Sequence, residues 1–206
     1  MSEPLRVGVL ASGRGSNFRA LAEAAAGGRI PAAVVVLVTD RAGAGVLAVA
    51  GELGIEAVVL EPGHHPSREA HEKAVIAALE ERRVGLVCLA GYMRLLSPGF
   101  VAHFTGRLLN IHPSLLPAFP GLHPQRQALE HGARVSGATV HFVDDGVDTG
   151  PIVLQAAVPV MTDDTEATLA DRILVEEHRL YVEAVRLFAQ GRLEIRGRRV
   201  RIRETP

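Results

Sequence analysis

The sequence predicts an α/β fold: a Rossmann-like, mostly parallel sheet with helices on both faces. Short apolar runs alternate along the chain with longer segments of helical spacing, which is the pattern of repeated strand and helix units. Hydrophobic residues make up 48% of the 206 residues but aromatic residues only 4%, so the core must be aliphatic. An aliphatic core of this kind is typical of a parallel sheet that is buried on both faces.

Each expected strand is a short run rich in Val, Leu, Ile or Ala that turn-forming residues bound. These runs are 5–11, 33–39, 56–60, 84–90, 108–112, 135–143 and 151–159. The expected helices occupy 18–26, 43–54, 67–82, 122–131 and a long segment from 163 to about 190. Asp163 and Thr165 are expected to cap this long helix, with Glu166 three residues after Asp163. A hairpin is expected in the tail, because apolar and charged residues alternate there around a Gly-Arg turn.

Length and charge favour a single domain, 1–206, that acts on small molecules. A formal net charge of -1 gives no overall attraction to nucleic acid or to a membrane surface. No run approaches the roughly 18 apolar residues of a membrane span, and the start does not resemble a signal peptide, so a cytoplasmic protein is expected. The one cysteine, Cys88, excludes an internal disulfide and is expected to be a buried, inert thiol. The tail arginines are expected to be solvated rather than to bind RNA.

The loop 12–17, Ser-Gly-Arg-Gly-Ser-Asn, joins the first strand to the first helix. This arrangement presents backbone N–H groups and a positive helix end to an anion, so it predicts a phosphate site; the alternative is a simple tight turn. A nucleotide P-loop is excluded, because the only lysine is Lys73. A dinucleotide fingerprint is half matched: Phe18 stands where a third glycine is needed, but Asp40 could bind a ribose. A nicotinamide enzyme therefore remains an alternative.

The stretch 108–117, Leu-Leu-Asn-Ile-His-Pro-Ser-Leu-Leu-Pro, reads as a strand that ends at His112, because the prolines cannot continue it. Asn110 and His112 are two residues apart and so share one face, toward the crevice beyond the carboxyl ends of the strands. The later loop 144–151 offers a carboxylate to the imidazole. An amide, an imidazole and a carboxylate suit acyl transfer to an amine. The alternative is a hydrogen-bonded structural histidine.

Two further stretches have competing interpretations. The loop 91–98 is led by glycine and is apolar, so it offers Met and Leu side chains to a flat ring or else forms a hydrophobic plug under the sheet. His64 and His65 are adjacent, but no other histidine lies at metal-ligand spacing. We therefore expect this pair to be solvated and predict no metal site.

These motifs, in this order, resemble those of the glycinamide ribonucleotide formyltransferases, folate-dependent enzymes of purine synthesis. The resemblance runs from 7 to about 191 and rests on the blocks 12–17, 90–97, 110–117 and 137–150. It implies transfer of a formyl group from 10-formyltetrahydrofolate to the amine of glycinamide ribonucleotide, giving formylglycinamide ribonucleotide and tetrahydrofolate. It also implies no metal, no nucleic-acid or membrane partner, and a monomer or homodimer.

The resemblance assigns roles residue by residue. The catalytic group would be Asn110, His112 and Asp148. The ribonucleotide would be held by Gly15, Ser16, Asn17 and Glu177, the glycine loop taking the phosphate. The formyl-folate would be surrounded by Arg68, Met93, Arg94, Leu95, Leu96, Asn110 and the loop from Asp144 to Asp148. The phosphate-binding half would be about 1–105, the folate and catalytic half about 106–190, and the hairpin about 191–203.

Two departures from the family pattern affect details of substrate binding rather than the reaction. Leu174 stands where some members have a polar residue, and Pro124-Gln125 follows His123 where a second histidine is sometimes found. Among related enzymes, the methionyl-tRNA enzyme would need a further tRNA-binding domain, and the formyl-folate deformylase usually has an N-terminal regulatory domain; neither is expected here. Alternatives from other classes are a nicotinamide-dependent oxidoreductase and a phosphate-ligand binding protein.

The expected chemistry follows from the three polar side chains. An amine that attacks a formyl carbon creates a negative oxygen, and each fixed donor aimed at it contributes on the order of 3 kcal/mol. Asn110 and a protonated His112 are the expected donors, and Asp148 is expected to favour the imidazolium. A proton must also pass from the attacking amine to the leaving nitrogen, through His112 or an ordered water.

Overall fold

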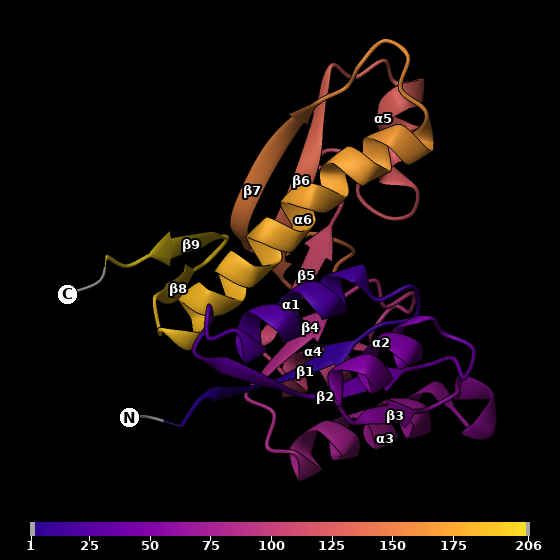
Figure 1. Cartoon of the computed structure of the whole chain (residues 1–206), viewed down its shortest axis with the longest axis vertical. Helices are drawn as coiled ribbons and strands as arrows, with labels where there is room; N and C mark the ends of the chain where they lie inside the picture. Colours follow the sequence, from indigo (N-terminus) through magenta and orange to yellow (C-terminus); the bar gives the residue numbers. More distant parts are fainter. Residues whose placement is uncertain (1–2, 205–206) are drawn as a thin grey trace. The chain divides into compact units, whose positions relative to one another are not determined.

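The computed structural model describes residues 3–204, which form two compact units, one up to Leu109 and one from Asn110 onward (Figure 1). Both combine a sheet with packed helices, which confirms the expected α/β class. Within residues 3–204, no helix is both long and apolar enough to cross a bilayer.

The first unit is built on parallel strands in the order β3-β2-β1-β4. The strands are β1 (Leu5–Leu10), β2 (Ala32–Thr39), β3 (Ala57–Val59) and β4 (Leu86–Leu89). The helices are α1 (Ser16–Ala26), α2 (Val46–Leu53), α3 (Arg68–Glu81) and α4 (Pro98–His103), with a 3-10 turn η1 (Pro62–His64). Helix α1 packs against α2 and β2, and α3 packs against α4 and β2. Cys88 on β4 is fully buried, as expected.

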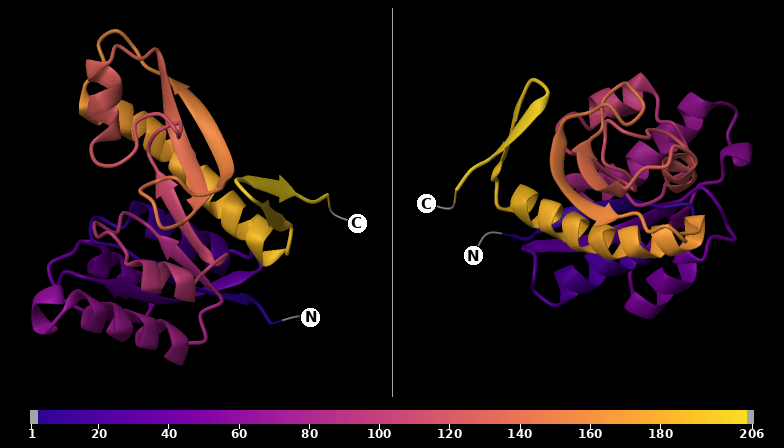
Figure 2. Two further views of the ribbon diagram at one scale, coloured as in Figure 1. Left: turned by 180° about the vertical axis from the view of Figure 1, so that it is seen from behind. Right: turned by 90° about the horizontal axis from the view of Figure 1, so that it is seen from above.

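The second unit begins within β5 (Leu108–His112), which ends at the predicted residue, and its strands follow the order β5-β6-β7-β9-β8. The others are β6 (Val135–Phe142), β7 (Ile152–Pro159), β8 (Leu193–Arg196) and β9 (Arg199–Ile202). Strands β6 and β7 are antiparallel, and β9 adds to β7 in parallel at Arg199. The long helix α6 (Glu166–Ala189) packs on β6 and β7, with α5 (Pro124–Glu130) against it (Figure 2). The β8–β9 pair is the expected hairpin.

At the start of α6, the expected cap by Thr165 is confirmed and the expected cap by Asp163 is not. Thr165 is the N-cap: its hydroxyl accepts from the Thr168 N–H at 3.2 Å, and the Thr168 hydroxyl accepts from the Thr165 N–H at 2.9 Å. The expected cap by Asp163 was therefore wrong. The neighbouring Asp164 makes the contacts at this helix start instead: it accepts from the Met161 N–H at 2.7 Å and from both terminal nitrogens of Arg172.

Helix α4 was not expected, because six residues are too few to show a helical period.

Candidate active site

Strand β5 delivers Asn110 and His112 to the start of a proline-rich loop that folds back around the imidazole. The backbones of Phe119 and His123 in this loop are left-handed, with φ of 54° and 55°. Such conformations cost a non-glycine residue about 1–3 kcal/mol and cluster at functional sites. The loop is thus held in shape by its surroundings.

His112 is 5% exposed and has an oxygen atom near each ring nitrogen. Its Nε2 lies 3.0 Å from the Phe119 carbonyl oxygen, and its Nδ1 lies 3.4 Å from Asp148 Oδ2. A carbonyl oxygen can only accept, so Nε2 carries a hydrogen. A second proton, at Nδ1, would lie directly beside a carboxylate. The surroundings of the ring therefore fit a group that takes up a proton and gives it back.

Burial lowers the pKa of His112 below its ordinary 6.5, and the Phe119 carbonyl and the Asp148 charge raise it only in part. The charged ring loses hydration that its two oxygen neighbours do not fully replace. Burial therefore disfavours the imidazolium that the sequence predicted at neutral pH. Asp148 raises the pKa of His112, which is the direction expected for it.

Asp148 binds the other members of the cluster. Its Oδ2 accepts from the Gly121 N–H at 2.8 Å, and its Oδ1 lies 3.5 Å from Asn110 Nδ2 and 3.6 Å from His141 Nε2. Burial acts to raise the pKa of this carboxyl, but the contacts with His141 and Gly121 and the nearby His112 outweigh it, so that pKa lies below the ordinary value. Asp148 is thus ionised where the enzyme would work, and its own φ is left-handed, at 54°.

His141 is a member of the cluster to which the sequence reasoning gave no role. It lies on β6, is 2% exposed, and has Nδ1 2.9 Å from the Phe142 carbonyl oxygen and Nε2 3.1 Å from Asn110 Nδ2. In the tautomer that carries its hydrogen on Nδ1 and donates it to this carbonyl, Nε2 accepts from the Asn110 amide. His141 therefore orients that amide. Its signal in the sequence was a histidine inside a strand rich in β-branched residues.

The loop that carries Asp148 is closed by Asp144. The Asp144 carboxylate accepts from the Gly146 N–H at 3.1 Å and from the Thr149 hydroxyl at 2.7 Å. From the hairpin, Arg198 donates to the Thr149 carbonyl at 3.1 Å. The structure thus places Asp144, predicted to contact folate, as a residue that shapes the loop ahead of Asp148.

In the first unit, the glycine loop lies at the start of α1. Gly15 is the N-cap, with φ of 84°, and a Cβ there would lie 2.6 Å from Val46 Cγ2. The Val46 N–H donates to the Gly13 carbonyl at 2.9 Å, so the loop packs against the start of α2. Ser16 and Asn17 are the first residues of α1, where the early N–H groups lack intrahelical acceptors. The geometry fits an anion.

Ser12 joins this glycine loop to the loop 91–97. Its N–H donates to the Gly91 carbonyl at 3.1 Å, and its hydroxyl accepts from the Met93 N–H at 3.0 Å. Farther along, Arg68 donates to the Leu95 carbonyl at 2.6 Å. The side chains of Met93 and Leu95 are 59% and 70% exposed, which argues against a hydrophobic plug. Arg94 and Leu96 are half-buried.

The remaining predicted residue, Glu177, lies on the buried side of α6. Leu174, which departs from the family pattern, is half-buried on the same helix.

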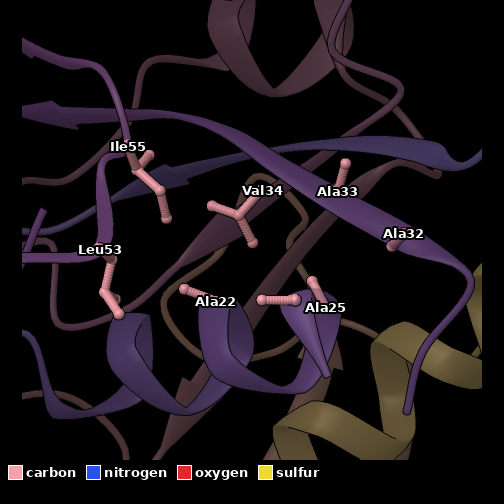
Figure 3. A pocket seen from close by; sticks show the side chains of 8 residues that line it. Ala22, Ala25, Ala32, Ala33, Val34, Leu53 and Ile55 are labelled. Atoms are coloured by element: carbon pink, nitrogen blue, oxygen red, sulfur yellow. The ribbon is translucent and has the colours of Figure 1, made fainter. Parts of the chain in front are cut away.

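An apolar pocket lies in the first unit, between α1, β2 and the end of α2, where Ala22, Val34 and Leu53 line it (Figure 3). Its lining carries no titratable side chain, so it offers no chemistry of the kind found around His112.

Comparison with known proteins shows the relationship directly. A model of the formyl transferase family matches residues 5–185. Phosphoribosylglycinamide formyltransferase of Escherichia coli K12 is 44% identical over 191 residues, covering 93% of this chain and 90% of that protein. The trifunctional purine biosynthetic protein adenosine-3 of Drosophila pseudoobscura is 48% identical over 197 residues, covering 94% of this chain. This chain spans only 14% of the length of that larger protein.

Comparison with solved structures supports the same relationship. Glycinamide ribonucleotide transformylase 1 from Symbiobacterium toebii superposes with a TM-score of 0.97 at 55% identity, covering 99% of this chain and 96% of that one. The mostly parallel α/β architecture is therefore the formyltransferase fold. From the matched family model and these relatives together, the chain belongs to the formyl transferase family.

Proposed function

We propose that this chain transfers the formyl group of 10-formyltetrahydrofolate to the amine of glycinamide ribonucleotide, in the cytoplasm and without a metal. The observation that carries the proposal is the buried cluster of Asn110, His112, His141 and Asp148 at the end of β5. The relatives named phosphoribosylglycinamide formyltransferase support the choice of substrates.

Asn110 serves as the donor to the oxygen that becomes negative during attack. Its Nδ2 has one hydrogen bonded to His141 at 3.1 Å and the other facing Asp148 at 3.5 Å. The second contact is long and therefore weak, so that hydrogen is the one available to an incoming oxygen. His141 keeps the amide turned so that nitrogen, not oxygen, faces the reacting group.

His112 serves as the proton-transfer group. Its lowered pKa leaves the ring able to accept the proton that the attacking amine must lose. A proton at Nδ1 lies beside Asp148 Oδ2, and the opposite charge stabilises it there. The ring can then release the proton toward the leaving nitrogen.

The proposed substrate-binding residues are those that the resemblance assigns. We propose that Gly15, Ser16 and Asn17 bind the phosphate of the ribonucleotide and that Glu177 binds the remainder. The exposed apolar side chains of the loop Met93–Leu96 fit the flat ring of a folate. Arg68, Asn110 and Asp144 complete the residues assigned to it.

The test is a reaction of the purified chain with 10-formyltetrahydrofolate and glycinamide ribonucleotide, followed by absorbance and by mass spectrometry of the product. We expect formylglycinamide ribonucleotide to form only when both substrates are present. His112→Ala should lower kcat by about 10²–10⁴-fold and change KM far less, because a proton-transfer group acts in the transition state.

Three results would contradict the proposal. Release of formate without the ribonucleotide would indicate a deformylase. Turnover that requires a nicotinamide would indicate an oxidoreductase. Binding of phosphate ligands with no turnover would indicate a binding protein.

A further inference from the structure

Glu72, on α3, is a buried carboxylate to which the resemblance assigns no role. It is 6% exposed, and both of its oxygens accept hydrogen bonds. Its Oε1 accepts from the Ser97 N–H at 2.8 Å and from Arg68 Nε at 3.2 Å, and its Oε2 accepts from the Ser97 hydroxyl. Burying a charge is costly unless it is paired and hydrogen-bonded. The partners of Glu72 satisfy that requirement.

These partners lie on either side of the apolar loop Met93–Leu96. Ser97 follows the loop directly and caps α4, because its hydroxyl accepts from the Phe100 N–H at 3.2 Å. Arg68 donates with its other end to the Leu95 carbonyl. Glu72 therefore holds the end of the loop through Ser97 and its middle through Arg68. Ser12 holds its beginning at the Met93 N–H.

We propose that Glu72 is a positioning residue for the folate ring, and that it fixes Arg68 and the loop Met93–Leu96 in one arrangement before the ligand binds. The proposal rests on the proposed function. Its physical basis is that Met93 and Leu95 remain exposed although exposure of apolar groups is unfavourable. A backbone fixed by hydrogen bonds keeps them from collapsing onto the protein, which lowers the ordering cost of binding.

The competing explanation is that Glu72 only links α3 to α4 and stabilises the first unit. The two explanations differ in what a mild substitution changes. Glu72→Gln keeps the shape of the side chain and one acceptor oxygen. It removes the negative charge to which Arg68 and Ser97 donate their hydrogen bonds. Positioning predicts loss of folate affinity alone, whereas a general structural role predicts losses for both substrates.

The test measures calorimetric binding of tetrahydrofolate and the KM of glycinamide ribonucleotide for the whole chain. In Glu72→Gln we expect tetrahydrofolate to bind about tenfold more weakly, as for loss of one charge-assisted hydrogen bond. The KM for the ribonucleotide and kcat should stay within about twofold, since the hydrogen-bond partners of Glu72 are Arg68 and Ser97, which belong to the proposed folate loop and its support. Glu69→Gln is the matched control, an exposed glutamate on the same helix, and should bind tetrahydrofolate like the unaltered chain.

A double variant tests the route of the effect. If Glu72 acts through Arg68, then Arg68→Gln with Glu72→Gln should weaken binding less than the product of the single effects. If Glu72→Gln fails to fold, Ser97→Ala replaces it and should weaken tetrahydrofolate binding by a smaller factor. Unchanged tetrahydrofolate affinity in a folded Glu72→Gln, or an equal loss for both substrates, would overturn the proposal. No tetrahydrofolate binding by the unaltered chain would instead contradict the proposed function itself.

Discussion

His112 illustrates how one side chain is balanced between two opposing effects. Burial removes water from the charged ring and lowers its pKa, whereas the Phe119 carbonyl and Asp148 favour the added proton. Burial is the larger effect, so the ring rests neutral at physiological pH. The carboxylate then matters most when the ring is transiently charged, which is the moment a proton-transfer catalyst must stabilise.

Replacing Asp148 by Asn tests this balance, because it keeps the shape and removes the charge. An opposite charge stabilises the protonated ring, so its removal should lower the pKa of His112 further below 6.5. The kcat should fall by about 10²–10⁴-fold. An NMR titration of the His112 ring in both proteins decides the matter. A pKa that is unchanged or higher in the variant would remove Asp148 from this role.

Gly15 is a residue whose role depends on its left-handed backbone conformation. Gly15→Ala must hold a left-handed φ and bring a Cβ against Val46, so the loop should shift. We expect the KM of the ribonucleotide to rise by about tenfold or more, with the KM of formyl-folate unchanged. Gly13→Ala is the control, since a Cβ there meets no atom within 4 Å. Equal changes in both KM values would exclude a phosphate site at this loop.

Among the elements, α6 shows how a helix start depends on side chains beyond the expected Thr165 cap. Thr165 and Thr168 form the capping box, and Asp164 binds Arg172, eight residues farther along the chain. The Arg172 guanidinium, with the Met161 N–H and the Thr168 hydroxyl, holds the pKa of Asp164 far below its ordinary 3.8. A carboxyl with a lowered folded-state pKa stabilises the fold above its ordinary pKa, and that stabilisation is lost as the pH falls below it.

Asp164→Asn should therefore lower the Tm at pH 7 by several degrees, because Arg172 loses its charged partner. The difference from the unaltered chain should shrink as the pH falls below 3.8, where Asp164 begins to lose its advantage. Thermal unfolding followed by circular dichroism at a series of pH values measures both effects. Asp163→Asn, one residue earlier and exposed, should leave the Tm unchanged at every pH. A constant difference across pH would show that the charge of Asp164 is not the cause.

At the scale of the whole molecule, local patterns predicted the elements and longer-range packing decided the site. The end of β5 at His112 was predictable because Pro113 cannot donate within a sheet. The aliphatic composition likewise indicated the sheet. The contacts of Asn110 with His141 and of Glu72 with Ser97 were not predictable, because they join residues 31 and 25 positions apart. No period or motif encodes which side chains such folding brings together.

The separate assignments of the two substrates predict how ligands stabilise the folded chain. A ligand at about 100 times its Kd adds about 2.7 kcal/mol to the free energy of unfolding. For a chain of this length that is a rise in Tm of about 5–10 °C. Glycinamide ribonucleotide and tetrahydrofolate should each produce such a rise in the unaltered chain.

The variants should separate the two increments. A tenfold weaker Kd at the same ligand concentration leaves about 1.4 kcal/mol, so the rise should be roughly halved. Gly15→Ala should show that reduction with the ribonucleotide only, and Glu72→Gln with tetrahydrofolate only, because Glu72 bonds to Arg68 and Ser97 and the proposal assigns the two residues to different ligands. Differential scanning calorimetry at matched ligand concentrations gives the four increments. If either variant loses both increments, its effect is on the folded state as a whole, and the assignment of that residue to one substrate is wrong.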